Sequence, residues 1–221
     1  MYTKFSKFMY NSVFPQLFEL HDYVGWVPIL GDLVKSKKRA IQNLNLKLGD
    51  KVFISSIGTG FELAYIFKKI GNNGSIVGVD ISEGMLKIGR NKIKRNGWVN
   101  VTLIQKDLKD FDFANDLGYK VDAVLSNFGY LDEKVLYNLI SILKPGGTLA
   151  ISGPQPLKGL RKILYPITFF PEMLFGLTWK TLNQMFVYID IMKKELENVV
   201  INEKTFGRYF VTVSGRKSMK L

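Results

Sequence analysis

The runs Lys51-Val-Phe-Ile-Ser-Ser-Ile-Gly-Thr-Gly60 and Ser75-Ile-Val-Gly-Val-Asp80 decide the fold of this 221-residue chain. Both runs are rich in consecutive apolar residues, which is typical of strands buried on both faces of a sheet. Residues 61–70 between them have helical character, and Gly71-Asn-Asn-Gly74 ends that helix with residues that tolerate left-handed geometry. A strand, a helix and a second strand in this order predict two parallel strands joined by a crossover helix.

The same alternation continues along the chain. Further apolar runs predict strands at 101–107, 121–127 and 148–152. Ser82 is suited to cap a helix that runs to about residue 95, and a helix over 132–143 is stopped by Pro145-Gly-Gly147. Strands alternating with helices predict an α/β fold whose parallel sheet is covered on both faces.

The two ends of the chain differ from this regular centre. Residues 1–48 have an aromatic, helical pattern with a turn expected at 24–31 and a helix at 35–46. Residues 154–192 are helical, aromatic and basic. Two last strands are expected at 199–205 and 209–214, joined by a hairpin at Phe206-Gly-Arg208.

The composition excludes several kinds of site. The chain has no cysteine and one histidine, His21, which rules out disulfides, a thiol nucleophile, Cys-ligated zinc and a multi-His metal site. We interpret His21 as a structural or surface residue. The apolar content of 47% supports a hydrophobic core, and the charged content of 23% is ordinary for a soluble protein.

The charge is strongly positive. Lys and Arg number 31 against 19 Asp and Glu, a net charge of +12. Such a balance favours nucleic acid, anionic lipid surfaces or acidic substrates, although it also serves solubility alone. The sequence shows no secretory signal and no window of about 18 uncharged apolar residues. We therefore expect a cytoplasmic protein, with peripheral contact to an anionic membrane as a further expectation.

The glycines after the first strand and the acid after the second suggest a ligand site. Gly58 and Gly60 let the backbone approach a ligand closely, and the following helix N-terminus presents free N–H groups. Asp80 ends the second strand, where a carboxylate can accept hydrogen bonds from ribose hydroxyls. The third glycine of a dinucleotide fingerprint is absent, because Leu63 stands in its place. The other interpretation is that these residues serve a tight turn and a strand end.

The order Ser56-Ile-Gly58-Thr-Gly60 resembles the first motif of the class I S-adenosylmethionine-dependent methyltransferases. The resemblance implies a Rossmann-like seven-stranded sheet, mostly parallel with an antiparallel last strand, and S-adenosyl-L-methionine as the cofactor. Two positions depart from the family pattern. Ile54 stands where the family has an acid that helps to order the methionine end of the cofactor, and Ser56 stands where it has its first glycine.

Other family marks follow in order over residues 45–153 and 199–217. By this resemblance Asp80 binds the ribose, Asp107 contacts the adenine amino group, and Asn127 ends the strand that faces the methyl group. Asn127 lacks the Pro-Pro-aromatic sequence of methyltransferases acting on nucleobase or glutamine amines, so we interpret it as satisfying backbone groups. The resemblance implies these cofactor-binding residues: Tyr10, Gly58, Thr59, Gly60, Asp80, Ile81, Met85, Asp107, Leu108 and Asn127.

Tyr10-Asn11 resembles a Tyr-Asp pair that closes over the cofactor in a subset acting on lipids and quinones, with Asn11 in place of the acid. We expect residues 1–48 to form an N-terminal helical cover. Residues 49–221 are expected to form the methyltransferase domain, with a helical lid inserted at about 154–196. The aromatic and basic residues of that insertion suit an interfacial helix on an anionic membrane, or a lid with its apolar side folded inward.

The sequence therefore predicts methyl transfer to a hydrophobic small molecule or a lipid headgroup, such as a quinone precursor or phosphatidylethanolamine. It indicates no catalytic residue and no metal. The net charge of +12 keeps an RNA or protein methyltransferase open, although no separate RNA-binding module is visible. Ile54 and Ser56 keep open a degenerate methyltransferase fold that only binds. The oligomeric state does not follow from the sequence.

Overall fold

The first two strands form a parallel pair as the sequence predicts. In the computed structural model, β1 (Lys51–Ser55) pairs with β2 (Ser75–Asp80) so that Ser55 lies opposite Val79. The structure describes residues 8–9, 11–16, 28–166, 178–203 and 209–219. Tyr10 and His21 lie outside the described residues, as do most residues of the expected first helix and the hairpin loop at 206–208.

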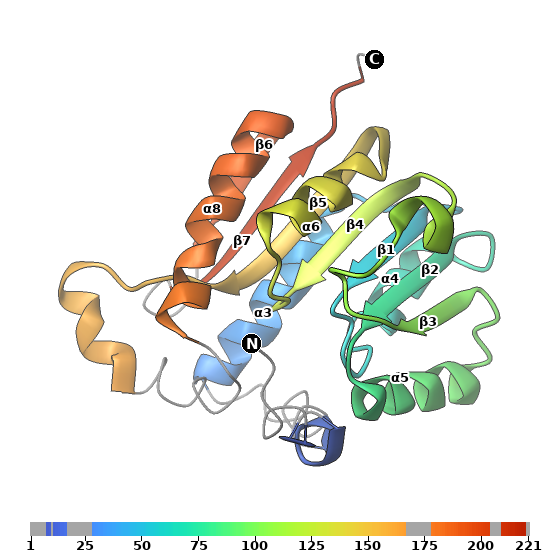
Figure 1. The fold of residues 1–221 in the computed structure, drawn as a ribbon, viewed down its shortest axis with the longest axis horizontal. Coiled ribbons are helices and arrows are strands. Elements are labelled where there is room, and N and C mark those ends of the chain that lie inside the picture. The colour runs from blue at the N-terminus through green and yellow to red at the C-terminus, as the bar shows by residue number, and fades with distance from the viewer. Residues whose placement is uncertain (1–7, 10, 17–27, 167–177, 204–208, 220–221) are drawn as a thin grey trace.

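The central sheet has seven strands in the order β3-β2-β1-β4-β5-β7-β6 (Figure 1). β1 to β5 pair in parallel, and β7 lies antiparallel between β5 and β6. The remaining strands are β3 (Val101–Gln105), β4 (Val121–Asn127), β5 (Leu143–Pro154), β6 (Glu197–Asn202) and β7 (Phe210–Arg216). The structure confirms the Rossmann-like, mostly parallel sheet with an antiparallel last strand.

Helices cover both faces of the sheet, as Figure 1 shows. Alternate residues of β1 enter the two layers, because successive side chains of a strand point to opposite faces. Ile54 packs in the core under α3, α4 and α5, whereas Phe53 packs on the other face with α6, α8 and Phe113. The helices are α3 (Pro28–Asn43), α4 (Leu63–Ile70), α5 (Glu83–Asn96), α6 (Glu133–Ser141) and α8 (Trp179–Glu195).

Several boundaries differ from the sequence expectation. β5 begins at Leu143 instead of residue 148, and β6 covers Glu197–Asn202 instead of 199–205. α3 begins at Pro28, so the turn expected over 24–31 is wrong for residues 28–31. Proline is well tolerated in the first turn of a helix, where its missing N–H would have no partner in any case. β1 ends at Ser55, before the end of the apolar run at Ile57, because Ser56 adopts a left-handed φ of 52° that a strand cannot continue through.

The segment after β5 leaves the sheet and returns through α8. It contains a short helical turn, η2 (Gly159–Leu164), and then residues 167–177, which lie outside the described part. α8 packs on the sheet through Met185, Ile189 and Met192. The part of the segment expected at 154–192 that the structure describes is therefore helical in α8 and only briefly helical before it.

Candidate functional site

The loop after β1 is held in a conformation that requires its glycines. Gly58 and Gly60 have φ values of 56° and 75°, in the left-handed region where a side chain is strained. A Cβ added to Gly58 would meet nothing within 4 Å, whereas one on Gly60 would lie 2.6 Å from the Leu63 side chain. The loop therefore turns tightly into α4 and leaves open space beside Gly58. Thr59 between them is buried.

Asp80 ties this loop to the end of β2. Its Oδ2 accepts a hydrogen bond from the Gly58 N–H at 2.8 Å, and its Oδ1 accepts one from the Ser82 N–H at 2.9 Å. Burial raises the pKa of Asp80 above its ordinary value, although N–H donors from Ser82, Gly58 and Ile81 act in the opposite direction. A carboxylate offers about four lone-pair directions. Asp80 therefore serves the turn and keeps acceptor capacity for a ligand.

The start of α5 lies next to Asp80. Ser82 caps the helix by accepting from the Met85 N–H at 3.2 Å, as the sequence predicts. Asn11 docks on the same turn, where its Oδ1 accepts hydrogen bonds from the Gly84 N–H at 3.0 Å and the Ser82 hydroxyl at 3.1 Å. A Cβ on Gly84 would lie 2.2 Å from the Asn11 carbonyl oxygen, so this contact needs glycine. The N-terminal segment therefore reaches the candidate site through Asn11.

The predicted site residues gather along one edge of the sheet. Because β3, β2, β1 and β4 are adjacent and parallel, their carboxyl ends meet there. We call Gly58, Asp80, Asp107 and Asn127 the strand-end cluster. Asp107 Oδ1 accepts from the Lys109 N–H at 3.0 Å and so stabilises its own turn. Of the other predicted residues, Ile81 is 40% exposed, while Met85 and Leu108 are buried in the core.

A chain of three buried side chains links the strand-end cluster to β5. The Ser152 hydroxyl donates to Asn127 Oδ1 at 2.7 Å, and Asn127 Nδ2 donates to Glu62 Oε1 at 2.9 Å. The interpretation that Asn127 satisfies backbone groups is therefore wrong, because its amide joins two side chains. Glu62 and Ser152 were not among the predicted site residues. A signal for Glu62 was present, since an acid directly follows Gly60-Phe61 at the beginning of an apolar helix.

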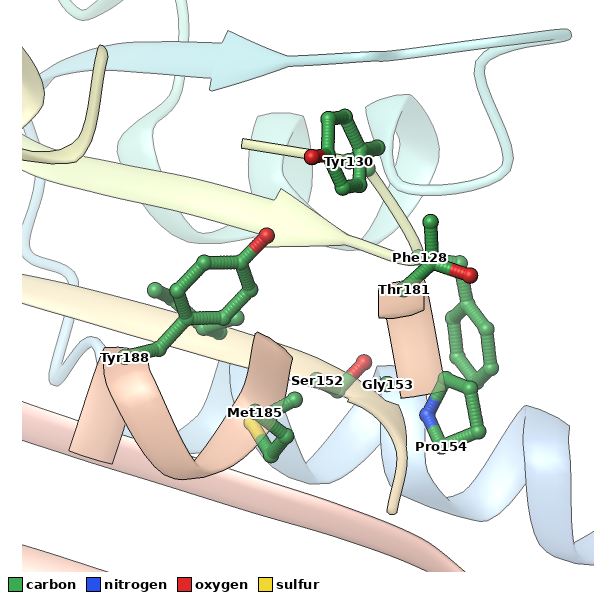
Figure 2. Close-up of a pocket in the computed structure, with 10 residues that line it drawn as sticks. Phe128, Tyr130, Ser152, Gly153, Pro154, Thr181, Met185 and Tyr188 are labelled. Carbon is green, nitrogen blue, oxygen red and sulfur yellow. The ribbon is translucent and has the colours of Figure 1, made fainter. Parts of the chain in front are cut away.

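A pocket opens beside this chain, between α8 and the carboxyl ends of β4 and β5 (Figure 2). We call it the β4–β5 pocket. Its cavity volume is about 70 Å³, and the pocket is partly open to solvent. Figure 2 shows Tyr188 at one end and Phe128 with Pro154 at the other. The lining residues are Phe128, Gly129, Tyr130, Ile151, Ser152, Gly153, Pro154, Thr181, Met185 and Tyr188.

The lining of the β4–β5 pocket is mostly apolar and aromatic. Tyr188 is fixed there, because its hydroxyl donates to the Leu131 carbonyl at 2.7 Å and accepts from the Leu131 N–H at 2.8 Å. Burial raises the pKa of Tyr188 well above its ordinary value, so the phenol stays protonated. None of the ten lining residues is an Asp, Glu, His, Lys or Arg. The lining is therefore suited to contact the apolar part of a ligand.

The chain is similar in sequence to known methyltransferases. Residues 55–147 match the family model described as "Methyltransferase domain". The chain is 29% identical over 172 residues to a demethylmenaquinone methyltransferase of Geobacillus stearothermophilus, covering 75% of this chain and 72% of that protein. It is 30% identical over 146 residues to the demethylmenaquinone methyltransferase of Staphylococcus saprophyticus, covering 63% of this chain and 60% of that protein.

Solved structures share the fold. The phosphoethanolamine N-methyltransferase 2 of Haemonchus contortus superposes with a TM-score of 0.63 at 12% identity, over 83% of this chain and 53% of that chain. An S-adenosylmethionine-dependent methyltransferase from Aquifex aeolicus superposes with a TM-score of 0.56 at 21% identity, over 82% of this chain and 89% of that chain. At these identities the likeness concerns the fold alone.

Proposed function

We propose that this chain is a class I S-adenosylmethionine-dependent methyltransferase that methylates a hydrophobic quinone-type acceptor bound in the β4–β5 pocket. The observation that carries this proposal is the position of the pocket. Its apolar, aromatic lining begins at Phe128, directly after the Asn127 end of the strand-end cluster. Relatives named demethylmenaquinone methyltransferase support an acceptor of this chemistry.

The strand-end cluster fits the cofactor of this family. Asp80 keeps acceptor capacity after binding the Gly58 and Ser82 N–H groups, and open space adjoins Gly58. A buried carboxylate oxygen without a partner, Oε2 of Glu62, lies in the turn that follows the same loop. We assign the ribose hydroxyls to Asp80 and the adenine amino group to Asp107. When bound, the cofactor supplies a sulfonium methyl group, which is electrophilic and leaves a neutral thioether behind.

The chain's own contribution is to position the acceptor and exclude water. Met185 and Tyr188 of α8 form one wall of the β4–β5 pocket, and Ile151 and Phe128 lie on the strand side. A wall of this kind aligns an acceptor for in-line attack and removes competing water, which accounts for a large part of the barrier lowering in transfer reactions. Because none of the ten lining residues is an Asp, Glu, His or Lys, a quinol acceptor would release its proton to water at the open side of the pocket.

A membrane surface is the expected source of such an acceptor. In η2 the side chains of Leu160 and Ile163 are 96% and 81% exposed, and Arg161 and Lys162 lie between them in the sequence. Exposed aliphatic groups beside cations suit a surface of anionic lipid, where each nearby Lys or Arg adds about 1 kcal/mol of binding free energy. No helix in the described part of the chain is long and apolar enough to span a membrane. The contact we propose is therefore peripheral.

One assay tests the acceptor. The protein is incubated with S-adenosylmethionine labelled with tritium on its methyl group and a reduced, prenylated naphthoquinol, and label in the organic extract is counted. Transfer to the naphthoquinol that Asp80→Ala reduces supports the proposal. Transfer only to phosphatidylethanolamine or to RNA in parallel incubations contradicts the quinone-type acceptor but keeps the methyltransferase activity.

Vesicle sedimentation tests the membrane contact. Vesicles containing phosphatidylglycerol should retain the protein more strongly than vesicles of phosphatidylcholine alone, and the double variant Leu160→Ser/Ile163→Ser should reduce that retention. Val99→Ser is the matched control, because Val99 is 94% exposed on the loop before β3, far from η2 in the sequence. Equal retention of the double variant and wild type would contradict the contact.

A further inference from the structure

Glu62 is a buried carboxylate with one oxygen left without a partner. The residue is 3% exposed and directly precedes α4, yet its side chain caps no helix N–H. Oε1 accepts the hydrogen bond from Asn127 Nδ2, whereas Oε2 is buried with no hydrogen-bond partner. An unpaired buried carboxylate oxygen is costly, and native structures rarely keep one without a reason. The unpaired Oε2 therefore points to a missing donor.

The groups around Glu62 indicate that the missing donor carries a positive charge. The Ser152 hydroxyl donates to Asn127 Oδ1, which turns the Asn127 amide so that its Nδ2 faces Glu62. The network thus supplies an N–H to Oε1, as an ionised carboxylate needs. The negative charge of Glu62 is also among the causes that raise the pKa of Asp80, so the two acids act on the same site. Two carboxylates in one site favour a positively charged ligand.

Lys37 lies close to Glu62 and Asn127, but it is not the missing donor to Glu62 Oε2. Its Nζ lies 4.9 Å from the centre of the Phe61 ring and 5.9 Å from that of Phe128. Phe61 and Phe128 flank the Glu62–Asn127 pair in the sequence. Among the described residues no ion pair joins Lys37 to Glu62, and the ammonium group lies over these two aromatic rings. The oxygen Oε2 remains available to another cation.

We propose that Glu62 binds the α-ammonium group at the methionine end of the cofactor. This inference rests on the proposed function. It also supplies an acid in place of the one that the family has at position 54, where this chain has Ile. Ile54 is fully buried in the core between β1 and the helices α3 and α4, so that position supplies no charge to the site. Glu62, eight residues later, brings a carboxylate to the same loop from the beginning of α4. Because Oε2 is buried, the surrounding side chains must move aside when the ammonium group binds, and this movement reduces the net binding free energy.

Calorimetry with two ligands tests the assignment. S-adenosylhomocysteine carries the amino-acid end, whereas 5′-methylthioadenosine has the same adenosine without it. Glu62→Gln preserves the shape of the side chain and its acceptor for Asn127 but removes the charge. We expect this variant to bind S-adenosylhomocysteine about 10- to 100-fold more weakly, the range typical of a lost charged hydrogen bond. Its affinity for 5′-methylthioadenosine should not change.

Asp80→Asn is the matched control. Both ligands contain the ribose that we assign to Asp80, so this variant should bind both of them more weakly. A measurement on the wild type adds a test that needs no variant. The deaminated analogue of S-adenosylhomocysteine, with a keto group in place of the ammonium group, should bind about tenfold or more weakly than S-adenosylhomocysteine itself. Equal affinities for the analogue and its parent would overturn the assignment.

The outcomes separate this inference from the proposed function. If the wild type binds S-adenosylhomocysteine and Glu62→Gln binds it equally well, Glu62 has no such role but the cofactor assignment stands. If Glu62→Gln weakens both ligands alike, Glu62 acts only by supporting the loop, and the inference fails. If the wild type binds neither ligand, the cofactor assignment fails and the Glu62 role fails with it.

Discussion

Replacing Asp80 by alanine tests the residue on which the strand-end cluster depends. The substitution removes a carboxylate that already accepts hydrogen bonds from Gly58 and Ser82. The N–H group of Ile81 also faces this carboxylate, so of about four lone-pair directions roughly one is left for a ribose hydroxyl. Hydrogen bonds to a charged group are worth about 1.5 to 3 kcal/mol, which corresponds to a loss of about 10- to 150-fold in affinity for the cofactor.

A cycle of two ligands and two proteins isolates the sugar contact. Calorimetry measures the binding of 5′-methylthioadenosine and its 2′,3′-dideoxy counterpart to the wild type and to Asp80→Ala. The wild type should strongly prefer the hydroxylated ligand, and the variant should lose most of that preference, because the coupling between Asp80 and the hydroxyls is absent. Any general loosening of the loop would weaken both ligands equally and cancel in the cycle. A variant that keeps the full preference would refute the ribose assignment.

Three further predictions concern stability. Tyr188→Phe leaves the Leu131 N–H and carbonyl buried without their partner, so the free energy of unfolding should fall by about 1 to 3 kcal/mol in urea melts; an unchanged midpoint would contradict this. Lys217→Met removes a cation that donates to the carbonyls of Ile140, Ser141 and Leu143, which should cost about 1 to 3 kcal/mol, whereas Lys87→Met at an exposed position of α5 is the control. The raised pKa of Asp80 means that the folded protein binds more protons than the unfolded chain above the ordinary value of 3.8, so the stability of the ligand-free protein should decrease as pH rises through that window. Thermal melts from pH 4 to 7 should show a shallower decrease for Asp80→Asn, and parallel curves would argue against the linkage.

The sequence predicts the sheet and the position of Asp80 because both follow from local pattern. Continuous apolar runs identify the parallel strands, and parallel neighbours must bring their carboxyl ends to one edge. The contact between Asp80 and Gly58 then follows from topology, and the structure contains it at 2.8 Å. The beginning of α3 at Pro28 did not follow, because the Gly and Pro residues of 24–31 also suit a turn.

The network of Glu62, Asn127 and Ser152 could not be predicted from the same reasoning. Its three members come from the start of α4, the end of β4 and the carboxyl end of β5. Their contacts depend on side-chain geometry across strands far apart in sequence, for which a single sequence carries no periodic signal. The family pattern, aligned on the glycines, places its acid at position 54, where this chain has Ile, and gives no role to position 62. The binding roles of Asp107, Ile81, Met85 and Leu108 stay predictions.

The place of β7 has a consequence for how the polypeptide matures. β7 lies between β5 and β6, and α3 packs on it through the hydrogen bond from Asn43 Nδ2 to Ser214 Oγ at 3.1 Å. As the ribosome makes the chain, five parallel strands emerge first, and the outer edge of β5 stays bare until residues 210–216 follow. A bare edge is a template for pairing with another molecule. Translation that stops before β7 would thus release an aggregation-prone chain, and we expect holdase chaperones to bind it.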